Sequence, residues 1–288
     1  MKKNNPYQAL KGSDIKRTRQ AALLLGPTNG GKTELLEALK SLRKLGVTRM
    51  SRLFANPDDP KFKMAESQGT HAIETTSNNV GLDSRPIRLF KSSLTLKDGA
   101  GDEEARKERI ESFVKNQIVP KPKRWRDGVL AIVVFNVSDI LVRNADNMEN
   151  VEASYREAVE IWGENLYPSE EEEVTRQAKD QRNSKKKINR TRIRPPFHPP
   201  FAILFVASHL DEVDSSLKSE ARQAVRGFVK EIVRNGRIHL EIPETMPPVE
   251  ARFILADLNS LQGRLQFALD FYKARADLTK VMKEEVER

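Results

Sequence analysis

Apolar residues occur along this chain in short continuous runs, separated by stretches in which they recur every three or four positions. Three of the runs contain almost no polar residue, which is typical of strands buried on both faces of a parallel sheet: residues 21–25, 129–137 and 201–207. Two further runs, 72–80 and 87–97, are separated by the turn-rich segment Gly-Leu-Asp-Ser-Arg-Pro. This arrangement predicts an antiparallel hairpin.

Helical spacing of apolar residues is found between and after these runs. It predicts four helices, at residues 33–46, 103–117, 151–162 and 217–233. A sixth strand is predicted at residues 237–242, and Pro247 and Pro248 are predicted to start a long helix whose apolar positions extend from Phe253 to Tyr272. The alternation indicates an α/β fold. We expect a mostly parallel six-stranded sheet with an antiparallel edge and helices on both faces.

The chain has 288 residues, enough to bury a full core. Residues 1–18 are polar and basic, and we expect a basic arm ahead of a single domain at 19–288. In residues 49–68 the apolar residues have no regular spacing, and this segment is predicted to form a long loop. Residues 167–200 hold four successive glutamates followed by a basic run, which predicts a charged insertion within the domain.

The net charge of +9 comes largely from basic clusters at residues 2–19, 121–126 and 185–194. Such clusters permit peripheral association with an anionic membrane through these segments. We interpret most of this charge as solvated loops and expect no specific nucleic-acid partner. The chain has no cysteine, which excludes disulfides and thiolate metal sites, and its N-terminus lacks the apolar segment of a signal peptide. A cytoplasmic location is therefore expected.

The apolar run at 21–25 leads directly into a phosphate-binding loop. Residues 26–33 have the sequence Gly-Pro-Thr-Asn-Gly-Gly-Lys-Thr, which fits the pattern Gly-x4-Gly-Lys-Thr between a strand and a helix. Gly30 and Gly31 let the backbone curl so that its N–H groups converge on phosphate oxygens. Lys32 would reach the terminal phosphates, the Thr33 hydroxyl would ligate Mg2+, and the helix N-terminus would favour the anion. The candidate nucleotide-binding residues of this segment are Asn29, Gly30, Gly31, Lys32, Thr33 and Glu34.

A second motif follows the alternating strand at residues 94–97. Asp98 ends the strand, and Gly101 follows three positions later. A carboxylate at this place could hold Mg2+ through water, while the Gly101 N–H could contact a γ-phosphate and so sense its loss.

These two motifs resemble those of the Ras-like small GTPases, whose third motif is Asp-x-x-Gly. The run at 129–137 is similar to that family's central strand, and Ser208-His-Leu-Asp211 stands where the family has Asn-Lys-x-Asp. The resemblance extends over about residues 20–240 and implies a P-loop fold that binds GTP or GDP with Mg2+. It implies that Asp211 accepts hydrogen bonds from the guanine N1–H and exocyclic amine, with Ser208 and His209 beside the base.

The resemblance also implies residues for the metal and for hydrolysis. A Mg2+-ligating switch threonine is placed at Thr70, and Thr76 is the alternative. Asp102 stands where the family usually has the glutamine that orients the attacking water, so Lys32 and Asp102 are the catalytic candidates. Because a carboxylate near a γ-phosphate is repelled, slow hydrolysis is expected.

The base-recognition motif departs from the family pattern. Ser208 replaces the asparagine that ties the base loop to the phosphate loop, and His209 replaces the lysine whose stem packs on the base. The family's final motif has two candidate placements, at residues 242–245 and 255–260.

Our leading hypothesis is a GTP-binding molecular switch with slow Mg2+-dependent hydrolysis and a protein effector or activator. Loops 49–71 and 98–106 would order around the γ-phosphate. A nucleotide-loaded scaffold or assembly module with little hydrolysis is the second hypothesis, which Asp102 and the charged insertion favour. A P-loop ATPase or small-molecule kinase is the third, and the absence of an arginine-rich lid near the motifs argues against a kinase.

Overall fold

The structure is a computed structural model that describes residues 19–43, 47–55, 87–89, 92–98, 103–120, 122–125, 127–166, 199–239 and 249–286. All statements on structure below concern these residues. No helix among them is both long enough and apolar enough to cross a membrane.

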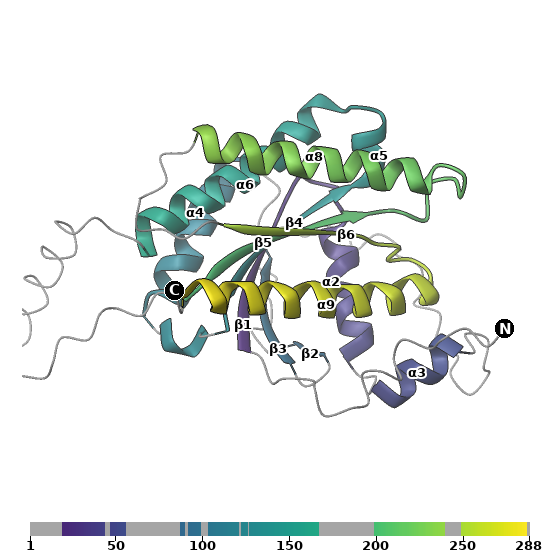
Figure 1. The fold of residues 1–288 in the computed structure, drawn as a ribbon, viewed down its shortest axis with the longest axis horizontal. Coiled ribbons are helices and arrows are strands. Elements are labelled where there is room, and N and C mark those ends of the chain that lie inside the picture. The colour runs from purple at the N-terminus through teal and green to yellow at the C-terminus, as the bar shows by residue number, and fades with distance from the viewer. Residues whose placement is uncertain are drawn as a thin grey trace, which may run out of the picture.

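The described strands form one sheet in the order β2-β3-β1-β4-β5-β6 (Figure 1). Their bounds are β1 Arg19–Leu25, β2 Ile87–Leu89, β3 Ser92–Asp98, β4 Val129–Asn136, β5 Phe201–Ser208 and β6 Glu250–Leu255. Parallel pairing joins β3 to β1, β1 to β4, β4 to β5 and β5 to β6, whereas β2 runs antiparallel to β3. The prediction of an α/β fold with a mostly parallel sheet is confirmed.

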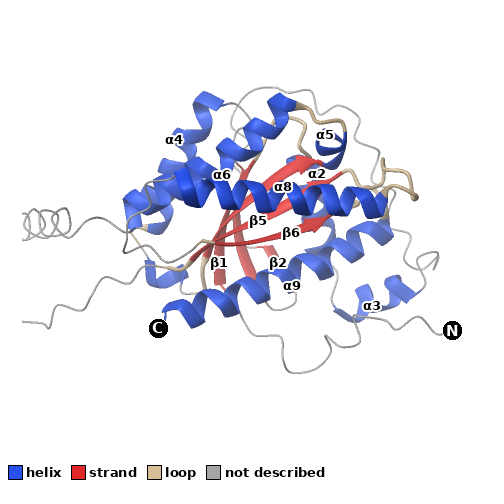
Figure 2. Cartoon of the chain, turned by 45° about the horizontal axis from the view of Figure 1, so that its top comes forward, coloured by secondary structure: helices blue, strands red, loops and turns tan. Residues whose placement is uncertain are grey.

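Helices cover both faces of this sheet (Figures 1 and 2). One face packs against α4 Glu103–Phe113, α5 Val137–Leu141, α6 Ala145–Leu166 and α8 Lys218–His239. The other packs against α2 Lys32–Arg43, α3 Val47–Ala55 and α9 Leu261–Val286. Strand side chains alternate between the two layers, so that Leu23 and Leu25 join the first core while Ala22 and Leu24 join the second.

The region around residue 250 is where the sequence-based prediction fails. The predicted strand at 237–242 is wrong over 237–239, which belong to α8, and the predicted helix is wrong over Glu250–Leu255, which form β6. Phe253 and Ile254 pack into opposite cores, as alternation along a strand requires. The apolar spacing of this six-residue segment also fits a helix, but its pairing with β5 makes it a strand. The helix α9 begins only at Leu261.

Two smaller corrections concern the first third of the chain. Residues 49–55 are not loop but part of α3, because Met50 and Leu53, three positions apart, are both buried against the second core. The run predicted as one strand at 87–97 is two antiparallel strands, β2 and β3. Its predicted hairpin partner at 72–80 lies outside the described residues.

A buried polar network fixes α9 to β1. The Gln20 amide nitrogen donates to Thr279 Oγ1 at 2.8 Å and to the Asp127 carbonyl at 3.2 Å. Arg275 Nε donates to Gln20 Oε1 at 2.8 Å. Burial of the guanidinium lowers the pKa of Arg275 to about 10, while the nearby Tyr272 opposes that shift. The strand that carries the phosphate loop is thereby held by a helix about 255 residues further along the chain.

Candidate nucleotide-binding site

The phosphate loop follows β1 at the carboxyl edge of the sheet, and its backbone requires glycine. Gly26 and Gly31 have φ angles of 121° and 89°, in the region that side chains rarely tolerate. A Cβ at Gly26 would lie 2.0 Å from the Val134 carbonyl oxygen of β4. Asn29 has a φ of 63°, a conformation that asparagine tolerates better than most residues. The loop is therefore wrapped tightly over the end of the neighbouring strand.

Lys32 is the first residue of α2, and its side chain folds back over the loop. Its Nζ donates to the carbonyl oxygens of Gly26 at 2.8 Å and Pro27 at 2.6 Å. The first intrahelical bond runs from the Leu35 N–H to the Gly31 carbonyl at 2.9 Å. The N–H groups of the first turn have no intrahelical partner and, with the ammonium beside them, form an arrangement that suits phosphate. Thr33 is exposed and Glu34 is half-buried in the same turn.

Ser208 joins the end of β5 to the phosphate loop. Its hydroxyl is buried, and its single proton is shared between the Gly30 carbonyl at 2.8 Å and the Phe135 carbonyl at 3.0 Å. A Cβ at Gly31 would lie 2.5 Å from Ser208 Oγ, so the backbone of Gly31 packs closely against the Ser208 side chain. The hydroxyl of Ser208 thus connects the end of β5 to the phosphate loop.

The same hydroxyl also contacts the imidazole of His209. Ser208 Oγ lies 2.7 Å from His209 Nδ1. The hydroxyl has a single proton, and that proton is directed at the two carbonyls, which can only accept. We therefore assign a proton to Nδ1, which donates to the hydroxyl oxygen of Ser208.

Asp211 is linked to the loop that follows β6. Its Oδ2 accepts a hydrogen bond of 2.7 Å from the Asn259 side-chain amide. The backbones of the two loops also meet, because the Leu210 N–H donates to the Ala256 carbonyl at 3.2 Å. Residues 255–260, one of the two candidate placements for the final motif, lie beside Asp211. Residues 242–245 are outside the described part of the chain.

The loop after β6 is held rigid by its own side chains. Asp257 Oδ1 accepts from the backbone N–H groups of Asn259 at 3.1 Å and Ser260 at 3.0 Å. Ser260 Oγ then accepts from the Gly263 N–H at 2.9 Å and caps α9. The sequence analysis included residues 255–260 as a candidate placement of the final motif but did not name Asp257 or Asn259, although Asp-x-Asn-Ser ahead of regularly spaced apolar residues is a helix-start signal.

Only part of the second motif lies in the described structure. Asp98 is the last residue of β3 and pairs with Leu24, two positions before the phosphate loop. Asp98 and the phosphate loop that leads to Thr33 therefore lie at the same ends of the parallel strands. Thr70, its alternative Thr76, Gly101 and Asp102 lie outside the described residues, and their roles stay predictions.

The helix after the second motif is anchored to its neighbour by a buried ion pair. Arg106 of α4 donates from Nε and Nη2 to the Glu157 carboxylate of α6 at 2.8 and 3.0 Å. A third bond of 3.2 Å reaches Asn150 Oδ1. The Arg106 side chain is fully buried, so this bidentate pair fixes where α4 starts relative to the sheet.

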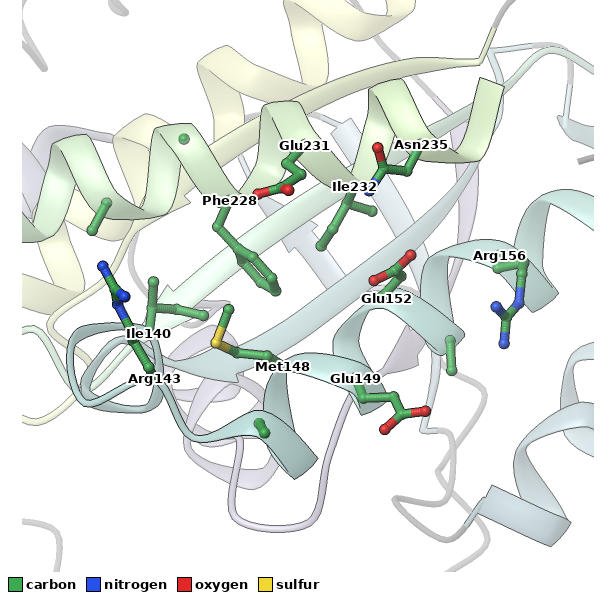
Figure 3. Close-up of a pocket in the computed structure, with 14 residues that line it drawn as sticks. Ile140, Arg143, Met148, Glu149, Glu152, Arg156, Phe228, Glu231, Ile232 and Asn235 are labelled. Atoms are coloured by element: carbon green, nitrogen blue, oxygen red, sulfur yellow. The ribbon is translucent and has the colours of Figure 1, made fainter. Parts of the chain in front are cut away.

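A separate hollow of about 940 Å³ lies between α6 and α8. Figure 3 shows Met148 and Phe228 facing each other across it, with Glu152 and Glu231 at its rim. None of the predicted site residues is among the described residues that line it. It is therefore not part of the phosphate or base site.

Comparison with known proteins gives distant similarity to solved structures. No family model matches the chain, and no curated protein is similar to it in sequence. The GDP-bound signal recognition particle receptor SRb of Chaetomium thermophilum is 11% identical over 89% of this chain and 99% of that one, with a TM-score of 0.41. The S. cerevisiae Ski7 GTPase-like domain bound to GTP is 16% identical over 85% and 44% of the two chains, with a TM-score of 0.38. A bacterial selenocysteine-specific elongation factor, EF-Sec, is 15% identical over 92% and 29%, with a TM-score of 0.40. At these scores, no ligand or activity is transferred to the chain.

Proposed function

We propose that this protein binds a guanine nucleotide with Mg2+ at the carboxyl edge of the sheet and hydrolyses GTP slowly as a nucleotide-dependent switch. The observation that carries the proposal is the bond between Ser208 and Gly30, because it joins a phosphate loop to a second loop that presents Asp211. Phosphate recognition alone would fit any P-loop protein. A carboxylate presented beside that loop adds a means of distinguishing guanine from adenine.

Each residue of the site has a distinct role in this proposal. Lys32 exchanges its bonds to the Gly26 and Pro27 carbonyls for phosphate oxygens. Thr33 and Asp98 hold the metal, which when bound neutralises charge that develops on the phosphates. Asp211 pairs with the base, and Asn259 keeps its carboxylate oriented before the nucleotide arrives.

Hydrolysis is expected to be slow because of Asp102. A carboxylate adds negative charge to an anionic site and cannot donate a hydrogen bond to the γ-phosphate. Asp102→Gln should raise the single-turnover rate of GTP hydrolysis, and Asp102→Ala should leave it near the wild-type rate. If Asp102→Ala instead slows turnover about a hundredfold, Asp102 is a working catalytic group. If no variant turns over GTP measurably, the nucleotide-loaded scaffold is the better description.

The experiment that tests nucleotide class is mass-spectrometric identification of the ligand released from purified protein by gentle denaturation, followed by calorimetry with GTP, GDP and ATP. We expect GDP or GTP to be released and ATP to bind at least tenfold more weakly than GTP. Release of ADP, or equal affinity for ATP and GTP, would replace this proposal with the ATPase alternative.

A switch of this kind acts through other molecules, and we propose a protein effector or activator as the partner. A cytoplasmic location, with peripheral contact to anionic membrane through the basic segments, belongs to the same proposal. Vesicle sedimentation with and without anionic lipid tests the membrane contact independently of nucleotide binding.

A further inference from the structure

A groove of about 610 Å³ runs along the outer edge of the sheet, between α8 and β6. In Figure 2, β6 lies at this edge between α8 and α9. Val229 and Val233 of α8 line the groove with Ala251 and Phe253 of β6. Phe253 is only half-buried, so the floor of the groove is apolar and partly open to solvent.

One side of the β6 backbone faces away from β5. Within the described part of the chain, β6 pairs with β5 alone. The Ala256 N–H donates to Ala207 of β5, and strand alternation therefore turns the N–H and C=O groups of Ala251 and Phe253 toward the open edge. Arg252 Nη1 donates to the Ala251 carbonyl at 3.0 Å, an oxygen with which no described strand pairs.

The rim of the groove is strongly basic. Arg226, Lys230 and Arg234 are exposed at intervals of four residues on α8. None of these three forms an ion pair with another described residue. Like charges at this spacing oppose helix formation. On β6, Arg252 adds a fourth cation against the single carboxylate of Glu250.

We propose that this groove is a docking site for an extended, acidic segment of a partner protein, which adds to β6 as a further strand. Its backbone would pair with Ala251 and Phe253, and its alternate apolar side chains would cover Phe253 and Val233. Its carboxylates would meet the cations of α8 and release Arg252 from the Ala251 carbonyl. The site is separate from the nucleotide-binding loops and needs no bound nucleotide.

The probe is the capped, fluorescein-labelled peptide Glu-Glu-Val-Glu-Val-Glu-Glu, titrated with the full chain and followed by fluorescence anisotropy. The same peptide with lysine in place of glutamate is the charge control. We expect the acidic peptide to bind and the basic one not to bind. The double variant Lys230→Glu/Arg234→Glu should weaken binding at least tenfold, whereas Lys107→Glu, an exposed lysine on α4, should not change it.

Strand addition is tested separately from charge. Ala251→Pro removes an outward N–H that β5 does not use and should weaken binding at least tenfold, whereas Ala251→Ser keeps that donor and should bind like wild type. If Ala251→Pro does not fold, hydrogen exchange in wild-type protein gives the answer, because the Ala251 and Phe253 amides should be protected when the peptide binds.

Four results would overturn the proposal. The first is equal binding of the acidic and basic peptides, and the second is unchanged hydrogen exchange at the Ala251 and Phe253 amides when the peptide is added. The third is a concentration-dependent dimer that Ala251→Pro abolishes. The fourth is binding to phosphatidylserine vesicles that Lys230→Glu/Arg234→Glu abolishes. The third would assign the edge to a second copy of this chain, and the fourth would assign the cations to a lipid surface.

Discussion

The phosphate loop and the base loops of the candidate site are built in different ways. The phosphate loop is formed by consecutive residues, and its internal bonds, such as Gly30 N–H to the Pro27 carbonyl at 3.2 Å, span only a few positions. The base loops come from two strand ends, and Asp211 and Asn259, which bond to each other, are 48 residues apart. Ser208, which connects the two parts, contacts a residue 178 positions away.

This difference determines what a substitution can do. A change in the phosphate loop alters the conformation that would direct the backbone N–H groups at phosphate, so it should remove affinity for every nucleotide. A change in the base loops alters side chains that the sheet already holds in register, with Ala207 beside Leu255. Such a change should affect the preference among nucleotides more strongly than the overall nucleotide affinity.

Gly26→Ala should have the largest effect, on both folding and binding. The added Cβ would meet the Val134 carbonyl oxygen at 2.0 Å in a conformation that alanine avoids. We expect a loss of about 2–4 kcal/mol in the free energy of unfolding, measured by urea denaturation, together with loss of nucleotide binding. Gly227→Ala is the matched control, since nothing lies within 4 Å of its Cβ, and in the middle of α8 it should stabilise by about 0.5–1 kcal/mol. Equal stability of the two variants would contradict the tight packing of the loop.

Lys32→Ala should reduce nucleotide affinity about a hundredfold while leaving the fold intact. It removes a charge from the phosphate site but no atom from either core, and a hydrogen bond to a charged group contributes about 1.5–3 kcal/mol. Calorimetry with GTP measures the loss, and circular dichroism checks the fold. Lys273→Ala, at an exposed position on α9, is the control. Equal GTP affinity of wild type and Lys32→Ala would refute the phosphate-loop assignment.

Ser208→Ala should weaken the binding of all nucleotides alike by about three- to tenfold. The substitution loosens the connection between the phosphate loop and the base loops but changes no residue that contacts the nucleotide. Loss of the buried hydroxyl leaves the Gly30 and Phe135 carbonyls without this donor, at a cost of about 1–2 kcal/mol in unfolding free energy. Competition between GTP and ATP measures whether the loss is uniform. A loss confined to GTP would mean that Ser208 contacts the base rather than holding the loops together.

Asp211→Asn should have the smallest effect on overall affinity and shift the preference from guanine toward xanthine. Xanthine has a carbonyl where guanine has its amine, and an amide can donate to that carbonyl. Competition of XTP against GTP measures the shift. Asn259→Ala, which removes only the amide that holds Asp211, should preserve the guanine preference and lower affinity a fewfold. An unchanged preference in Asp211→Asn would favour the ATPase alternative.

The same contrast explains how much could be predicted from the sequence. The phosphate loop was found because its glycines, lysine and flanking apolar runs lie within 13 consecutive residues, 21–33. The buried strands β4 and β5 were found because both faces are apolar. In contrast, β6 is an edge strand of the described sheet and has one buried side chain, Ile254, so its pattern did not exclude a helix. For the same reason Asn259 was not singled out within the candidate motif at 255–260, because its position depends on where β6 ends.

The network of Gln20, Arg275 and Thr279 has a consequence for the order of events during protein synthesis. Gln20 belongs to the first strand of the domain, whereas its partners lie about 255 residues later. Until the ribosome has passed Thr279, β1 cannot acquire the contacts that fill its buried end, even though the phosphate loop that it carries has long been translated. β1 therefore completes its packing only after α9 has been synthesised, and a chaperone that protects this strand would have to remain until α9 has docked.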